Sequence, residues 1–179
     1  MLVATGVQIR SVTMRHGGKE KNPALFLSGM KDLRSLCLKV ISIVLNKYDS
    51  IDYGSNFWNI FFTAVKPLVE KFTQESGSNE TPSSLFICFL EMSKSLKLAS
   101  FLQREKSLVT NILSILSVKS VSEAMVSAIL SFVENLLNLE DGNDEDQENV
   151  LLQEILLPHL DILFTSMQNL VQLRRESKR

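Results

Sequence analysis

The chain is poor in the residues that interrupt or cross-link a fold. Its 179 residues include only 7 glycines, 4 prolines and 2 cysteines. So little glycine and proline argues against a turn-rich β-sandwich or barrel. Cys37 and Cys88 each lie within an apolar helical pattern, which favours buried free thiols over a disulfide or redox pair. The sequence therefore predicts a fold held by apolar packing.

Long apolar runs are also missing. None reaches the roughly 18 residues that a membrane span needs, and the first ten residues have no charged region ahead of their apolar piece, unlike a signal peptide. These observations predict a cytosolic or nuclear protein with no membrane partner.

Cations are absent from residues 120–173, which hold 10 Asp and Glu. Residues 1–119 hold 15 Lys and Arg against 9 Asp and Glu, a net charge of +6, and residues 174–179 hold 4 against 1. A stretch without cations cannot follow a phosphate backbone by itself. Any contact with nucleic acid is therefore expected from the first two thirds of the chain or from the basic tail.

The usual catalytic and metal-binding motifs are missing as well. The chain has no Cys-x-x-Cys, His-Glu-x-x-His, glycine-rich phosphate loop or Gly-x-Ser-x-Gly elbow. Its two histidines, His16 and His159, are far apart, and His159 is expected to be a satisfied or surface residue. We therefore predict no enzyme, no catalytic, cofactor-binding or metal-binding residues, no cofactor and no small-molecule substrate. Dispersed catalytic residues are a minor alternative.

The acidic segment 140–149, EDGNDEDQEN, resembles a calcium-binding loop at first sight. Counted from Asp141, position 6 is Asp146 where an EF-hand needs glycine, and position 12 is Leu152 where it needs glutamate. The segment is therefore predicted to be a solvated acidic loop. A docking loop for a basic partner is the alternative.

What the chain does contain is helical periodicity. Apolar residues recur at helical spacing in six segments, 31–48, 55–73, 82–95, 106–117, 121–139 and 150–173. In the first of them Asp32 lies in the first turn and Lys47 in the last, signs that suit the helix dipole. Pro67 and Pro158 fall inside two of the patterns and are expected to bend or break them. Thr81 and Pro82 read as a cap and a first helical residue.

The segment 120–139, SVSEAMVSAILSFVENLLNL, has an apolar face twice as wide as that of an ordinary amphipathic helix. Ser120 and Glu123 have the spacing of a capping box, and at 100° per residue the apolar arc spans roughly 200°. Such a helix needs more than one neighbour, so we expect an inner helix of a layered all-α stack. Five aromatic residues in 55–73 have helical spacing too, which favours a core over a platform for stacked bases: Phe57, Trp58, Phe61, Phe62 and Phe72.

Proline position favours a HEAT-type α-solenoid segment of about six helices over an irregular helical bundle. Pro67 and Pro158 occupy similar frames in two helices, and proline-free helices alternate with them, as in the outer and inner helices of HEAT repeats. We expect a flexible N-terminal segment over 1–29, repeats over 30–173 and a basic tail over 174–179. Neither terminal helix has the polar side of a capping helix, so the piece is expected to be cut from a longer array.

Four runs carry a resemblance to a known family: KDLRSLCLKVISIVLNKYD, FWNIFFTAVKPLVEKF, PSSLFICFLEMSKSLKL and FVENLLNLED. Over about residues 30–173 the chain resembles a section of the large HEAT-repeat scaffold of the small-subunit processome, the small-nucleolar-RNA-associated component 20 or down-regulated-in-metastasis family, and most of all its plant members. Residues 1–29 do not match it well.

The resemblance implies a nucleolar or nuclear scaffold for early 18S ribosomal RNA processing and ribosome biogenesis. Its implied partners are proteins of the pre-ribosomal small-subunit particle, with pre-ribosomal RNA or small nucleolar RNA as further candidates. The family offers no catalytic residues to transfer. The alternative from the residues alone is a free-standing helical adaptor that binds a partner helix and is unrelated to ribosomes.

Overall fold

The structure, a computed structural model, describes residues 23–73, 80–139 and 155–176. Within these ranges every regular element is helical, which confirms the all-α class. The α-helices are α2 (Pro23–Lys47), α3 (Gly54–Val69), α5 (Ser84–Met92), α6 (Leu96–Ala99), α7 (Leu108–Ser114), α8 (Glu123–Leu137) and α10 (Leu160–Glu176). Short 3₁₀ turns join them: η1 (Ser100–Arg104), η2 (Ile115–Ser117) and η3 (Leu157–His159).

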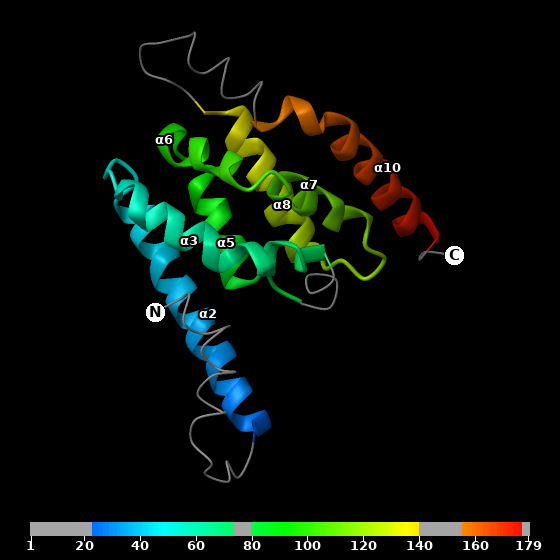
Figure 1. Ribbon diagram of the computed structural model, residues 1–179. Helices are drawn as coiled ribbons and strands as arrows, with labels where there is room; N and C mark the ends of the chain where they lie inside the picture. Colours follow the sequence, from blue (N-terminus) through cyan, green and yellow to red (C-terminus); the bar gives the residue numbers. More distant parts are fainter. Residues whose placement is uncertain (1–22, 74–79, 140–154, 177–179) are drawn as a thin grey trace.

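The helices form two rows, and successive long helices of the chain alternate between the rows. In one row α2 and α8 each pack against α5. In the other, Asn111 of α7 donates a hydrogen bond of 3.0 Å to the carbonyl of Val69 at the end of α3, and α10 packs against α7 and η2. α2 and α10 consequently lie at opposite ends of the molecule (Figure 1). This pairing is compatible with a HEAT-type solenoid, which stays a prediction.

The core is one continuous apolar cluster, and the aromatic residues of α3 belong to it. Trp58 is 1% exposed and stacks on Phe101 of η1, with the ring centroids 4.3 Å apart. Phe61 and Phe62 are buried, as is Phe72 just beyond the helix. The predicted core role is confirmed, and these four buried rings are not a platform for bases.

Helix α2 begins earlier than its periodicity predicted. It begins at Pro23 and not at Lys31, so the first turn contains no acidic residue and Asp32 lies well inside the helix. Proline fits the first turn because its missing N–H has no partner there in any helix. Gly29, which interrupts the apolar pattern, is tolerated within the helix. The expected position of Lys47 in the last turn is confirmed.

Both predicted N-caps are displaced by two residues. The cap of α5 is Ser83, whose hydroxyl accepts a hydrogen bond from the amide of Phe86 at 3.2 Å. The cap of α8 is Ser122, which accepts from the amide of Met125 at 3.1 Å. The Thr81 cap and the capping box of Ser120 were therefore wrong. Ser83 and Ser122 both have the extended backbone geometry of an N-cap, and each hydroxyl accepts from the amide three residues later.

Three other helix limits differ from prediction. α5 ends at Met92, and the expected apolar connection after it is helical, as α6 and η1. The segment 150–173 contains a 3₁₀ turn around Pro158 before α10 begins at Leu160, so this proline breaks the pattern as expected. Pro67 lies near the end of α3, and the helix continues past it to Val69.

Several predicted features lie outside the described residues. They are residues 1–22 of the predicted flexible segment, the acidic loop 140–149, His16, and Lys178 and Arg179 of the basic tail. Residues 23–29, which were also assigned to that segment, belong to α2.

Helix α8 provides a matched test of this packing. Phe132 is fully buried against α5, whereas Leu137 is 56% exposed. Phe132→Ala should lower the free energy of unfolding by about 3–5 kcal/mol, because it leaves a cavity in the core. Leu137→Ala should change it by less than about 0.5 kcal/mol, as at other exposed sites. Urea denaturation followed by circular dichroism measures both. Equal losses would mean that α8 does not pack as described.

Candidate interaction surfaces

An apolar stripe runs along the outer side of α2. Its residues are all exposed although they are aliphatic: Leu33, Leu36, Val40, Ile43 and Val44. The opposite side of the helix faces α5, where Leu38 is buried and Ser35 shares a hydrogen bond of 2.8 Å with Ser84. At 100° per residue the stripe points directly away from α5. A helix that is apolar on two opposite sides normally has a neighbour on each.

A second stripe lies on α8. Leu130 and Leu137 are exposed, and Val126 beside them is half-buried. The side that meets α5 carries Phe132, which contacts the ring of Phe86, and Asn135, which donates to Ser93 at 3.0 Å. This stripe also points away from α5, at the end of the α2–α5–α8 row opposite to α2. The wide apolar arc of 121–139 is therefore covered only in part, contrary to expectation.

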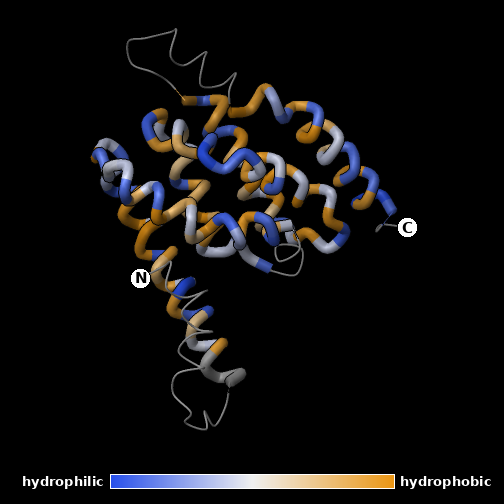
Figure 2. The backbone as a smooth tube through the Cα atoms, in the orientation of Figure 1, coloured by the Kyte–Doolittle hydropathy of each residue, from blue (hydrophilic) through white to orange (hydrophobic). Residues whose placement is uncertain are grey.

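A third stripe lies on α10. Phe164, Met167 and Val171 are exposed on one side, with Phe164 60% exposed. The side toward α7 and η2 carries the buried Ser166, and Asn169, which donates to Ser117 at 3.2 Å. This stripe points away from α7, as that of α8 points away from α5. Hydrophobic positions recur along both α2 and α10 (Figure 2).

These stripes define two surfaces, named here by their helices. The α2 face consists of the α2 stripe, and the α8/α10 face of the stripes on those two helices. The α2 face is bordered by three exposed charged residues, the cations Lys39 and Lys47 and the acid Asp32. The α8/α10 face is bordered by three acids and two cations, Glu123, Glu134, Asp161, Arg174 and Arg175. The two faces therefore carry small net charges of opposite sign.

Arg174 is already engaged within the α8/α10 face. Its guanidinium lies 3.7 Å from the Glu123 carboxylate and donates to the carbonyl of Val121 at 3.4 Å. These contacts join the end of α10 to the start of α8, so the two helices are tied together at this edge. Arg175 lies in the last turn of the same helix.

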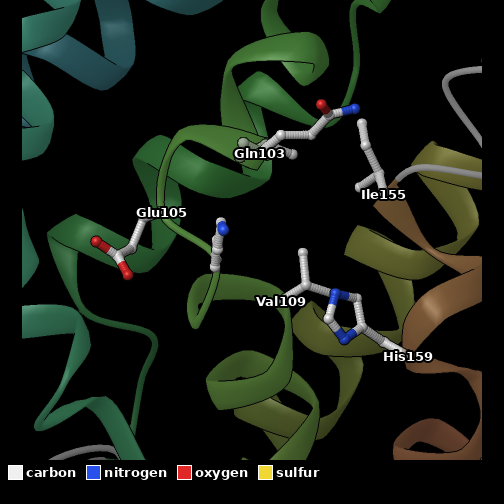
Figure 3. A pocket seen from close by; sticks show the side chains of 7 residues that line it. Gln103, Glu105, Val109, Ile155 and His159 are labelled. Atoms are coloured by element: carbon white, nitrogen blue, oxygen red, sulfur yellow. The ribbon is translucent and has the colours of Figure 1, made fainter.

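A pocket of about 380 Å³ opens between η1, α7 and η3. Leu102, Val109 and Ile155 form apolar walls, and Gln103, Glu105, Lys106 and His159 add polar groups. Val109, Ile155 and His159 lie on one side and Glu105 on the other (Figure 3). Glu105 accepts hydrogen bonds from Ser107 and lies 3.8 Å from Lys66. The pocket suits an apolar side chain that has a polar group beside it.

His159 links η3 to α7. Its Nδ1 lies 3.2 Å from the hydroxyl of Thr110 on α7, and burial lowers the pKa of the imidazole below its ordinary value. A neutral ring is therefore favoured at neutral pH. The expectation of a satisfied histidine is confirmed.

Cys88 is a structural thiol. It is fully buried and donates a hydrogen bond of 3.1 Å to the carbonyl of Leu38, which links α5 to α2. Burial, helped by the charge of Glu91, raises its pKa to about 12. The thiolate required of a nucleophile or metal ligand is thus strongly disfavoured. Cys37 is a free cysteine of intermediate burial, so the prediction of a buried thiol holds for Cys88 alone.

Two further observations concern the part of the chain that the structure describes. No group of three or more His, Cys, Asp or Glu side chains there is arranged to hold a metal ion. None of the helices in the same ranges combines the length and apolarity required to cross a membrane.

The paired rows of helices with exposed apolar stripes define a class, an all-α protein made of stacked helices. Comparison with known proteins identifies the family. The family model described as U3 small nucleolar RNA-associated protein 20, N-terminal, matches residues 2–179, and the chain belongs to this family. The match includes residues 2–29, so the expectation that residues 1–29 do not match the family well is wrong. No solved structure matches the chain.

Family membership implies a part in ribosome biogenesis and in the small-subunit processome. It also implies association with particles related to the U3 small nucleolar RNA and a nucleolar or nuclear location.

Thiol labelling should distinguish the two cysteines. With a pKa of about 12, only about one Cys88 side chain in ten thousand is ionised at pH 8 in the folded chain. We expect iodoacetamide to modify Cys37 and leave Cys88 unmodified until denaturant is added, as measured by peptide mass spectrometry. Rapid modification of Cys88 in the native chain would contradict its burial.

His159 should make stability depend on pH. The folded chain resists protonation of this imidazole, so the unfolded chain binds more protons as the pH falls through about 6.5. The free energy of unfolding should therefore decrease from neutral to mildly acidic pH, and His159→Gln should show a smaller decrease. Urea denaturation across this range tests the expectation. Identical pH profiles for the two chains would contradict it.

Proposed function

We propose that this chain is a non-catalytic helical-repeat scaffold of the small-subunit processome that binds proteins of the pre-ribosomal particle through the α2 face and the α8/α10 face. The supporting observation is that each stripe points away from the helix that packs behind it. Large exposed apolar patches on otherwise well-packed proteins commonly mark sites of protein contact. Two such faces at opposite ends suit a protein that joins neighbours.

The chemistry of the titratable groups supports a structural role over the enzyme alternative. Cys88 is a candidate nucleophile and His159 a candidate base, and each makes a hydrogen bond to a neighbouring helix. Their pKa values are shifted toward the uncharged form, Cys88 upward and His159 downward. Both shifts have burial as their leading cause, and neither reports a pair of groups that activate each other.

Contact with pre-ribosomal RNA or small nucleolar RNA forms a second part of the proposal. Residues 1–119 carry the excess of cations, whereas 120–173 carry none. An RNA contact would therefore lie on the side of α2, α3 and the turns around η1, where Lys66, Lys97 and Arg104 are found, or at the basic tail 174–179. The free-standing adaptor is disfavoured because the family match covers nearly the whole chain.

Affinity purification of the tagged chain from cells tests this function. We expect the wild-type chain to enrich U3 small nucleolar RNA together with processome proteins. Leu36→Asp in the α2 face and Phe164→Asp in the α8/α10 face should each reduce the recovered proteins several-fold, because a carboxylate in an apolar contact loses its hydration. Thr165→Asp adds the same charge on another side of α10 and serves as the control.

The outcomes separate the alternatives. Equal recovery with both face variants would show that these surfaces do not carry the contact. A single partner unrelated to ribosomes would support the adaptor and contradict the proposal. If RNA is lost at high salt while the proteins remain, the RNA contact is mainly electrostatic, as expected for the cationic part of the chain.

A further inference from the structure

The two faces lie where the stacking of the helices is interrupted. Within the chain, α5 receives α2 on one side and α8 on the other. The open side of α8 is therefore equivalent to the side of α5 on which the next helix of the row packs. In the other row, the open side of α10 is equivalent to the side of α7 on which α10 packs. The α8/α10 face therefore occupies the position that a helix–helix contact occupies elsewhere in the two rows.

The charges favour a particular kind of helix there. The acids Glu123 and Glu134 border the α8 stripe, and Glu134 makes no ion pair within the described residues. A helix that is apolar on its contact side and carries cations at its edge would meet these carboxylates favourably. The α2 face of the same chain has that composition, with Lys39 and Lys47 beside five exposed aliphatic side chains.

We propose that a second copy of this chain docks head to tail, with the α2 face of one copy on the α8/α10 face of the other. Such a contact joins unlike surfaces, so a pair of chains leaves one face of each kind free. The free faces remain available to the pre-ribosomal particle. The proposal concerns the same surfaces as the proposed function but does not rest on it, because it makes no use of ribosomal partners.

Sedimentation velocity of the purified chain over a wide concentration range is the first test. We expect wild type to show reversible association that increases with concentration. Leu36→Asp and Phe164→Asp alone should each weaken association at least roughly tenfold, since each places a carboxylate in the contact. Thr165→Asp should associate like wild type. A wild-type chain that remains monomeric throughout would overturn the proposal.

Mixing the two face variants gives the decisive result. Leu36→Asp keeps an intact α8/α10 face, and Phe164→Asp keeps an intact α2 face. Together they should form a one-to-one complex that stops at two chains, at concentrations where each alone remains monomeric because its own association is weakened. Dimers of Leu36→Asp or of Phe164→Asp alone would show pairing between like faces, and absence of a mixed complex would also overturn the head-to-tail contact.

A second pair of variants guards against misfolding. Val40→Asp and Met167→Asp lie in the same two stripes and are also exposed in the single chain. They should reproduce the monomeric behaviour and the mixed complex. Circular dichroism and thermal melting of each variant should match wild type, because none of the four positions belongs to the core.

Discussion

The burial of α5 is the constraint on which the rest of the structure depends. Its nine residues include five buried side chains that meet three other helices. Phe86 contacts Phe132 of α8, Phe89 contacts Phe61 of α3, and the thiol of Cys88 is bonded to the carbonyl of Leu38 in α2. A helix this short is marginal by itself and is stabilised mainly by its neighbours. The positions of α2 and α8 therefore follow from the packing of one central helix.

α5 packs against α2 on one side and α8 on the other, so the outer sides of α2 and α8 remain exposed. α2 and α8 are both apolar on two sides, but α5 covers only one side of each. The same holds for α10, which covers α7 with Ser166 and Asn169 and leaves Phe164 outside. Surface apolar residues are ordinary when scattered. Here they are aligned along helices and directed away from the core, which is why they are interpreted as contacts.

Sequence periodicity predicted most helices and the aromatic core, because both depend on local spacing. It misplaced the start of α2, where Gly29 obscured a helix that Pro23 had begun, and it chose Ser120 over Ser122 because cap propensity does not distinguish nearby serines. Periodicity also predicted that neighbouring helices would cover the whole apolar arc of 121–139. Which part of an arc is covered depends on residues far away in sequence, so Leu137 had to be seen in the fold to be recognised as exposed.

The alignment of the α8 and α10 stripes depends on the break before α10. Pro158 cannot continue a regular helix from the preceding residues, and the chain turns through η3 instead. His159 then anchors this turn to Thr110, and Arg174 ties the far end of α10 to the start of α8. Between these two contacts, α10 has Ser166 buried and Asn169 bonded to Ser117, while Phe164 and Val171 stay exposed. A proline, a histidine and an arginine thus set where α10 begins, how its start contacts α7 and how its end contacts the start of α8.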